Sequence, residues 1–328
     1  MMAGTDMLWK LAQPKRLFGF PMWRRVGSDR PPLLASRFQQ GRLPMQYGYV
    51  DTSLAQVHYA RKGAGAPLVL LAASGRSSRM FSGLMELLAP QFDVCALDTP
   101  GFGNSGALPP GTEIEQLAEC VVQVMDGLGI ARAHLYGLHT GNKIATALVG
   151  KWPNRVDQLV LAGQSHSLIP DRALRNATIL DIVRDYMEPP VSGSAAALAN
   201  WAATFQRLSS IWWDRQLVTA GATAEARDAA RNLMLDELQS EGTADLYRAN
   251  FAYDLGLGFT AITAPTLVLE IATPAEDQTI GRQGPAVQRL IPGATLRTIL
   301  EPRGHTLTLE NRARDLADIL IETLRPNF

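Results

Sequence analysis

The chain has 328 residues, of which 46% are hydrophobic and 19% charged, and its 31 Lys and Arg residues balance its 31 Asp and Glu residues. This composition is typical of a globular protein with a sizeable core, and a formal net charge of zero gives no global field that would favour nucleic acid or an anionic membrane. No apolar run approaches the roughly 18 to 20 residues that span a bilayer, and no compact apolar leader opens the chain. We therefore expect a cytoplasmic protein with a small-molecule partner, no nucleic-acid partner and no membrane span.

Residues 1–45 are predicted to form an irregular N-terminal extension. Basic residues are interleaved there with tryptophan and phenylalanine, and Pro31-Pro32 follows them. A membrane-surface or partner-binding arm could have this composition. We favour an extension that wraps over the main domain.

From residue 46 the pattern changes to short strands. Two of them, over residues 46–50 and 55–61, are predicted to form an antiparallel hairpin. His58 alternates with apolar neighbours on the second strand, and we expect it to face solvent rather than to act in catalysis.

Beyond this hairpin, strands and helices alternate, which is typical of a doubly wound, mostly parallel α/β sheet. Strands are predicted over residues 67–72, 92–97, 156–162, 264–270 and 295–300, with another that begins at residue 133. Helices are predicted over residues 79–88, 114–128, 142–152, 285–290 and 309–324. The strand pattern disappears over residues 170–256, which we interpret as a helical insertion over one end of the sheet.

Both cysteines fall inside these apolar patterns. Cys95 lies in a predicted strand and Cys120 in a predicted helix, and neither has the spacing of a metal site. We expect two buried core thiols. Neither a metal site nor a cofactor is predicted.

The stretch Gly137-Leu138-His139-Thr140-Gly141 joins a predicted strand to a predicted helix. This is the layout of a nucleophile elbow, in which a sharp turn exposes the middle side chain above the sheet. A Cβ at Gly137 or Gly141 would crowd the turn or the packing of helix on strand, so glycine suits both positions. The central residue, His139, stands where a serine would be expected.

With these motifs the chain resembles the α/β-hydrolase superfamily, specifically members with a helical cap inserted after the sixth strand. The resemblance is carried by the glycine elbow, the turn from Asp98 to Ser105 that is similar to D-x-x-G-x-G-x-S, the insertion, and Gly304-His305 before the last helix. It implies an α/β-hydrolase core over residues 46–169 and 257–328, with a helical cap over residues 170–256.

Three positions depart from the pattern of these relatives. His139 replaces the usual serine, and the oxyanion loop, usually His-Gly-x-Pro-Gly, is Ala72-Ala73-Ser74-Gly75-Arg76. Pro274 lies near the usual aspartate, with Glu276 and Asp277 slightly beyond it. Together these departures favour different chemistry, or none, over a damaged esterase.

The resemblance also implies roles for other residues. Asp98 would be structural and would organise the turn through Gly101, Phe102 and Gly103. His305 occupies the position of the catalytic base, with a surface histidine that caps the last helix as the alternative, and Asp277, Glu276 or neither of them would orient it. The backbone N–H groups of Ser74 and Thr140 would form the oxyanion hole, because backbone donors survive side-chain substitution.

Three further kinds of residue could line the pocket. Arg76 could bind a substrate carboxylate, although an exposed arginine is the commoner outcome. His166 follows the sixth strand and belongs either to the pocket or to a loop. Trp212 and Trp213 suggest an apolar pocket wall, although packing inside the cap explains them equally well.

His139 admits more than one chemical role. An imidazole can attack a carbonyl as a nucleophile, or it can act as a general base for water or for an acidic C–H group. The second role is favoured, because imidazole is bulkier than a hydroxymethyl group and its reference pKa of about 6.5 suits proton exchange near neutrality. A neighbouring His305 would disfavour double protonation and keep one imidazole neutral. A histidine satisfied by hydrogen bonds in an inactive site is the competing interpretation.

The leading hypothesis is an enzyme that acts on a small, fairly apolar carbonyl compound, such as an ester, lactone or β-diketone, through His139 and His305. One alternative keeps the fold but not the hydrolysis, as in a lyase, an isomerase or a cofactor-free oxygenase. Another is an inactive ligand-binding protein. A monomer or a homodimer is expected.

Overall fold

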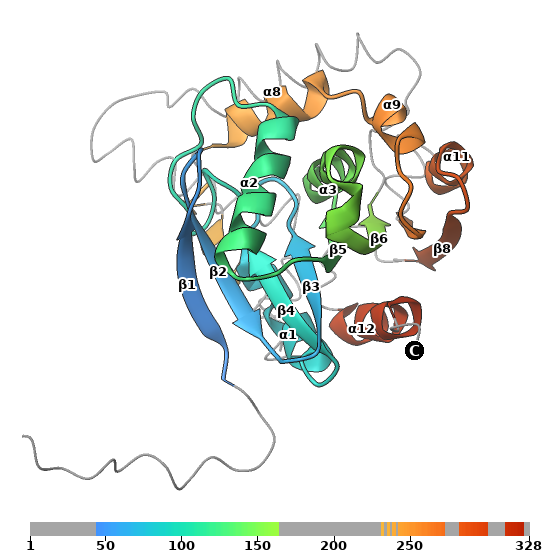
Figure 1. Cartoon of the computed structure of the whole chain (residues 1–328), viewed down its shortest axis with the longest axis horizontal. Helices are drawn as coiled ribbons and strands as arrows, with labels where there is room; N and C mark the ends of the chain where they lie inside the picture. Colours follow the sequence, from blue (N-terminus) through green and yellow to red (C-terminus); the bar gives the residue numbers. More distant parts are fainter. Residues whose placement is uncertain are drawn as a thin grey trace, which may run out of the picture. The chain divides into compact units, whose positions relative to one another are not determined.

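A computed structural model describes residues 44–163, 231–232, 235–236, 238–240, 242–272, 282–300 and 312–324. These residues form an eight-stranded sheet with the strand order β1-β2-β4-β3-β5-β6-β7-β8 (Figure 1). The strands are β1 (Gln46–Asp51), β2 (Gln56–Lys62), β3 (Ala66–Leu71), β4 (Phe92–Leu97), β5 (Ala133–Leu138), β6 (Val156–Ala162), β7 (Thr266–Ala272) and β8 (Thr295–Leu300). Strand β2 pairs antiparallel with β1 and β4, and every other neighbouring pair is parallel. The predicted mostly parallel α/β sheet is confirmed.

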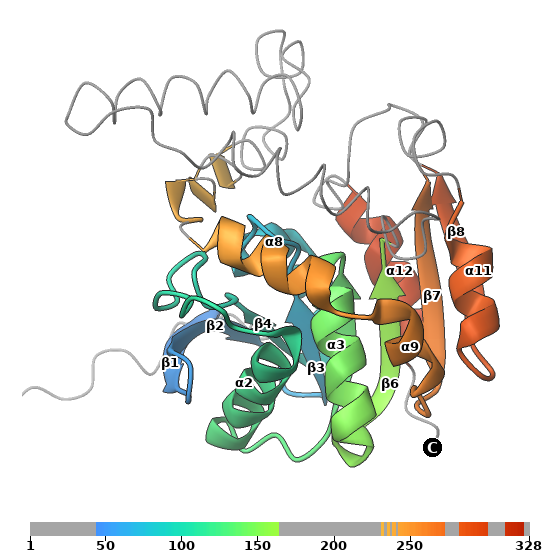
Figure 2. The same ribbon diagram turned by 90° about the horizontal axis from the view of Figure 1, so that it is seen from above.

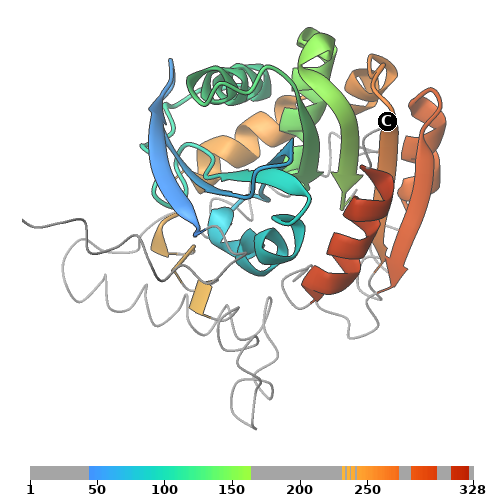
Figure 3. The ribbon, with the colours of Figure 1, turned by 60° about the horizontal axis from the view of Figure 1, so that its bottom comes forward.

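Helices cover both faces of this sheet. The described helices are α1 (Ser82–Leu88), α2 (Ile114–Gly127), α3 (Thr140–Lys151), α8 (Thr243–Ala252), α9 (Leu255–Thr260), α11 (Gly284–Leu290) and α12 (Ala313–Thr323), with short 3-10 turns η1 (Ser78–Phe81) and η2 (Pro153–Arg155). Helices α1 and α12 lie on one face, and α2, α3, α8, α9 and α11 lie on the other (Figure 3). The sheet is therefore doubly wound, as predicted.

The central strands are apolar along their whole length because both of their faces are covered. Every residue of β4 and of β5 is buried. Successive residues pack into opposite layers: Leu135 lies in the layer with α2 and α3, and Tyr136 lies in the layer with α1 and α12. The apolar runs in the sequence are thus continuous because these strands are buried on both faces of the sheet.

The observed bounds differ from the predicted ones mainly at helix starts. The helix predicted from residue 79 is the turn η1 followed by α1. Helix α3 begins at Thr140, two residues before the predicted start, because the chain leaves β5 within the single residue His139. The closing helix is described from Ala313, and residues 309–311 lie outside the described part.

His58 corrects one expectation. It does not face solvent: it is only 5% exposed, and its Nδ1 lies 2.8 Å from Oδ2 of Asp98. Tyr47 and Tyr49 of the neighbouring edge strand lie over its ring, with centroids 5.9 and 5.2 Å away. Its partners come from other strands, so alternation along β2 alone could not reveal its burial.

The two cysteines are buried, as predicted, at 1% exposure for Cys95 and 2% for Cys120. Burial raises the pKa of Cys95 to about 12. Among the helices that the structure describes, none combines the length and apolar composition that a membrane crossing requires.

The insertion between β6 and β7 is described only at its end. Helix α8 belongs to it, as do residues 231–232, 235–236 and 238–240. Most of the predicted helical cap over residues 170–256 lies outside the described residues, as does the N-terminal extension up to residue 43. The predicted domain bounds therefore stay predictions.

Candidate active site

His139 occupies a sharp turn between β5 and α3. Its φ is 49°, and it is the one non-glycine residue with positive φ in the described part of the chain. Its N–H donates to the carbonyl of Ala162 at 3.0 Å, and its own carbonyl accepts from the N–H of Asn142 at 3.0 Å. Such a backbone costs a non-glycine residue about 1–2 kcal/mol, so its surroundings must hold it in place.

The flanking glycines are needed for the reason that the sequence suggested. A Cβ on Gly137 would stand 2.4 Å from the carbonyl oxygen of Gly141. A Cβ on Gly141 would stand 2.3 Å from the carbonyl oxygen of Leu71 in β3. Contacts this short are not found between real atoms, so only glycine allows both the turn and the close packing of α3 on the sheet.

The imidazole of His139 lies against Gly163, the residue that follows β6. A Cβ at position 163 would be 3.0 Å from both Cε1 and Nε2 of the ring. The side chain as a whole is half-buried, but Nε2 is fully buried. The amide nitrogen of Asn142 donates to the carbonyls of Ala162 at 2.8 Å and Gly163 at 2.9 Å, which fixes the backbone beneath the ring.

The two residues predicted for the oxyanion hole meet beside this turn. Ser74 and Thr140 are 66 positions apart in sequence, yet their hydroxyl oxygens are 2.5 Å apart. Thr140 is the first residue of α3, where the N–H has no intrahelical acceptor. Ser74 follows β3, whose carboxyl end lies beside that of β5. The fold therefore brings both backbone donors to the same edge of the sheet as His139.

Asn250 of α8 joins this pair, and sequence reasoning missed it. Its Nδ2 donates to Thr140 at 2.8 Å and to Ser74 at 3.1 Å, and the residue is 5% exposed. Its backbone carbonyl accepts from Nζ of Lys143 at 2.8 Å, and this nitrogen also lies 5.1 Å from the ring centroid of Phe251. Helix α8 thus runs across the start of α3 (Figure 2). The available signal was an asparagine among the apolar and small residues of the insertion, which is weak.

Arg76 of the oxyanion loop is buried rather than exposed, at 6% exposure. Its Nε donates to Oδ2 of Asp236 at 3.0 Å. Asp236 is 1% exposed, and its other oxygen accepts from the hydroxyl of Ser77 and from Nη1 of Arg79 at 3.1 Å. The arginine predicted to bind a substrate carboxylate is therefore already paired with a carboxylate of the insertion. Its predicted role in substrate binding stays a prediction.

A second tie between core and insertion is made by backbone alone. The N–H of Gly242 donates to the carbonyl of Gly101 at 3.1 Å, and the N–H of Gly103 donates to the carbonyl of Gln239 at 3.1 Å. The two backbone segments cross so closely that a Cβ on Gly101 would be 2.8 Å from the Cα of Gly242. The end of the insertion is thereby fixed to the turn that follows β4.

Asp98 organises that turn, as predicted. Its carboxylate is 1% exposed and accepts hydrogen bonds from the N–H of Ser78 at 2.6 Å and of Asn104 at 2.9 Å, besides its contact with His58. Burial alone would raise the pKa of Asp98, but these hydrogen bonds outweigh it and hold the pKa below its ordinary value. These partners come from β2, the start of η1 and the turn after β4, so the carboxylate holds three segments together, which agrees with a structural role.

The remaining predicted residues lie outside the described part of the structure: His166, Trp212, Trp213, Glu276, Asp277 and His305. Their roles stay predictions. Within the described ranges, no group of three or more His, Cys, Asp or Glu side chains could hold a metal ion.

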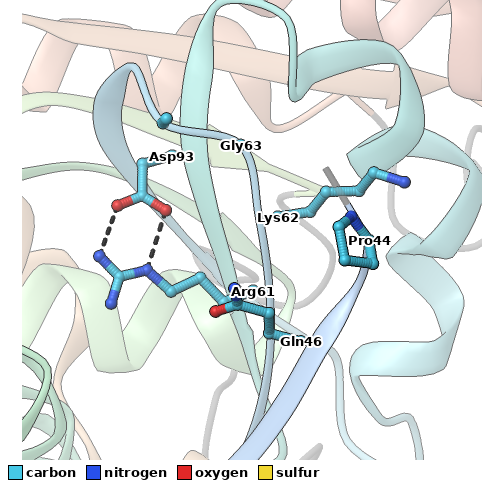
Figure 4. Close-up of a pocket in the computed structure, with 7 residues that line it drawn as sticks. Pro44, Gln46, Arg61, Lys62, Gly63 and Asp93 are labelled. Atoms are coloured by element: carbon cyan, nitrogen blue, oxygen red, sulfur yellow. Dashed lines mark hydrogen bonds and ion pairs between the residues drawn. The ribbon is translucent and has the colours of Figure 1, made fainter. Parts of the chain in front are cut away.

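A polar groove of about 390 Å³ lies elsewhere, near the start of β3 and β4 (Figure 4). It is lined by Pro44, Gln46, Arg61, Lys62, Gly63, Ala64 and Asp93. The guanidinium of Arg61 donates to both carboxylate oxygens of Asp93, at 2.9 and 2.6 Å. His139 follows the carboxyl end of a parallel strand, so this groove at the amino ends belongs to the opposite edge of the sheet.

Comparison with known proteins agrees with this geometry. A family model described as alpha/beta hydrolase fold matches residues 66–305. The chain belongs to the alpha/beta hydrolase fold family. The match spans the sheet from β3 onward and includes the turn at His139.

Individual relatives of this alpha/beta hydrolase share shorter stretches. It is 38% identical over 117 residues to the dihydrolipoyllysine-residue acetyltransferase component of an acetoin cleaving system from Cupriavidus necator, covering 35% of this chain and 31% of that protein. It is 33% identical over 104 residues to a zearalenone hydrolase from Cladophialophora bantiana, covering 30% of this chain and 39% of that protein. The matches thus span less than half the length of these relatives.

A solved structure shows the likeness of fold over a longer stretch. The enol-lactonase from Burkholderia xenovorans LB400 matches with a TM-score of 0.62 and 22% identity, covering 84% of this chain and 99% of that one. At this identity the likeness concerns the fold of the alpha/beta hydrolase and not its substrate.

Proposed function

We propose that the chain is an enzyme that acts on a small, fairly apolar carbonyl compound, such as an ester, lactone or β-diketone, at His139. The observation that carries the proposal is the backbone of His139, held at φ 49° beside the hydroxyl pair of Ser74 and Thr140. Strained residues of this kind cluster at active sites, where the surrounding structure maintains them. The named activity of one relative, a zearalenone hydrolase that is 33% identical over 104 residues, supports hydrolysis.

His139 acts as a general base in this proposal. Its Nε2 is buried at Gly163, so attack by that nitrogen on a carbonyl carbon would require the ring to turn outward. Proton transfer requires only hydrogen-bonding distance to water or to an acidic C–H group. A base acting through Nε2 also needs this nitrogen uncovered, so the preference for a base rests on the bulk of the imidazole, which fills part of the space where an acyl carbon would sit for attack.

The proposal gives other residues supporting roles. His305 is the second imidazole of the site, and Asp277 or Glu276 orients it. The N–H groups of Ser74 and Thr140 bind the developing oxyanion. His166, Trp212 and Trp213 line the substrate pocket.

Turnover of a panel of activated esters, lactones and β-diketones tests the proposal. His139→Ala is expected to lower turnover by about 10²-fold or more, the range for loss of a general base. His134→Gln is the matched control, because His134 lies near the start of β5, at the far end of that strand from His139. Absence of turnover in the wild type, or equal turnover in His139→Ala, would refute the proposal.

A reaction without hydrolysis is the second candidate, and the replacement of serine by a base favours it. In this reading the histidine removes a proton from the substrate, as a lyase, an isomerase or a cofactor-free oxygenase requires. Product analysis in heavy-oxygen water separates the two candidates, because only hydrolysis must incorporate solvent oxygen. Thermal stabilisation by a panel compound without conversion would instead indicate a ligand-binding protein.

A further inference from the structure

Three side chains beside His139 form a closed triangle of hydrogen bonds. Oγ of Ser74 lies 2.5 Å from Oγ1 of Thr140, and the side-chain amide of Asn250 lies 3.1 Å from the first and 2.8 Å from the second. If the amide oxygen faced the hydroxyls, two hydrogens would have to serve three contacts, and one pair of oxygens would repel. With Nδ2 facing them, four hydrogens are available. The triangle therefore fixes the orientation of the amide.

The same count leaves one hydroxyl hydrogen over. Nδ2 gives one hydrogen to each hydroxyl, and one hydroxyl gives its hydrogen to the other, which leaves a single O–H that must donate outside the triangle. Thr140 and Asn250 are each 5% exposed, whereas Ser74 is half-buried. The outward donor is thus Ser74, and Thr140 donates to it.

We propose that the Ser74 hydroxyl is a third donor to the substrate carbonyl oxygen, beside the backbone N–H groups of Ser74 and Thr140. Asn250 is the positioning residue that keeps this hydrogen available. Donors aimed in advance at a developing negative charge are among the strongest contributions to catalysis, because they need no reorganisation as the charge forms. The inference rests on the proposed function, because the oxyanion that the Ser74 hydroxyl would bind forms in the proposed reaction.

Asn250 is well placed for this role because it is held from both ends. Its carbonyl accepts from Nζ of the buried Lys143, which stands on α3 one turn beyond His139. Its Oδ1 is buried and makes no hydrogen bond within the described part of the chain. If the amide turned by 180°, Oδ1 would face the two hydroxyls, whose two hydrogens cannot serve all three contacts. The observed orientation is therefore the favourable one.

Steady-state kinetics on the best panel substrate tests the inference. Ser74→Ala is expected to lower kcat by about 10²-fold with little change in KM, as for loss of one oxyanion donor. Thr140→Val leaves the Ser74 hydrogen free and is expected to lower kcat by a clearly smaller factor. Ser74→Thr, which keeps a hydroxyl, is expected to retain most of the activity. Thermal unfolding of each variant shows that it is folded.

Asn250→Asp is the sharper variant, because it changes one donor group into an acceptor with almost no change in shape. Both hydroxyls then donate to the carboxylate and none is left for substrate. The carboxylate charge also repels the oxyanion, so the expected loss in kcat is at least that of Ser74→Ala, and the double variant loses no more than Asn250→Asp alone. A purely structural role for Asn250 would give additive losses.

Binding of phenylphosphonate, an anionic analogue of the oxyanion, separates this inference from the proposed function. If the wild type turns over substrate through His139 and Ser74→Ala stays within threefold of it, the inference is wrong and the proposed function stands. If nothing turns over but Ser74→Ala binds the phosphonate at least tenfold more weakly than the wild type, the donor exists and the proposed function is wrong. If neither turnover nor binding depends on Ser74, both are wrong.

Discussion

The imidazole of His139 packs so closely on Gly163 that a methyl group there would push it away: a Cβ would be 3.0 Å from both Cε1 and Nε2. Gly163→Ala is therefore expected to displace the ring and lower turnover at least tenfold. Gly129→Ala is the matched control, because Gly129 has nearly the same φ, 70° against 66°, but nothing within 4 Å of its added Cβ. Both variants should lose about 1 kcal/mol of stability from backbone strain. Equal turnover in the two variants would show that the ring position does not matter.

Strain at His139 can be measured by comparing two substitutions. His139→Ala and His139→Gly both lack the imidazole and differ only in the Cβ. At φ 49° the glycine variant is expected to be more stable than the alanine variant by about 1 kcal/mol or more, measured by urea unfolding. In an ordinary helix or strand the sign is the opposite. A more stable alanine variant would contradict the strained turn.

Asp236 should be the most costly acidic residue to neutralise among those in the insertion that are described. Its carboxylate accepts from Arg76, Arg79 and Ser77 while almost fully buried. Asp236→Asn is expected to lower the free energy of unfolding by about 3 kcal/mol, since breaking a buried pair leaves charge uncompensated. Asp245→Asn, which removes an exposed pair with Arg248, is expected to cost less than about 1 kcal/mol. Similar losses would show that burial of Asp236 is unimportant.

Acid should remove the contribution of Asp98 to stability. Burial pushes the pKa of Asp98 upward, but hydrogen bonds from His58, Asn104 and Ser78 hold it below its ordinary value of 3.8. The folded state thus binds this proton less readily than the unfolded state, so the carboxylate stabilises the fold above that value and loses its effect as pH falls through the lowered pKa. The stability gap between wild type and Asp98→Asn is expected to shrink as the pH falls below about 4. A gap that widens in acid would contradict this linkage.

The sequence predicted the sheet well because its strands are buried on both faces. Apolar runs of that kind are continuous, and the glycines at positions 137 and 141 mark the turn between β5 and α3 by steric necessity. His58 was misjudged because its carboxylate partner comes from the end of another strand, 40 positions away. Local alternation carries no information on such a contact.

The ties between core and insertion were beyond sequence reasoning for the same physical cause. Arg76 and Asp236 are 160 positions apart, and Asn250 and Ser74 are 176 apart. Neither Asp236 nor Asn250 belongs to a motif, and their partners are known only once the end of the insertion folds over the loop after β3 and the start of α3. His305 and its two candidate carboxylates, Glu276 and Asp277, stay predictions, because they lie outside the described residues.

The close crossing of Gly101 and Gly242 also bears on how such a protein can diversify. A Cβ on Gly101 would stand 2.8 Å from the Cα of Gly242, and a Cβ on Gly242 would stand 3.0 Å from the Cα of Gly101, so the described end of the insertion packs on the core as tightly as a segment of the core itself. A recombination junction placed upstream of Asp236 would exchange the part of the insertion that precedes it while preserving the contacts of Asp236 with Arg76 and of Asn250 with Ser74. Substrate range could then change by exchange of one segment, without any change to the turn that holds His139.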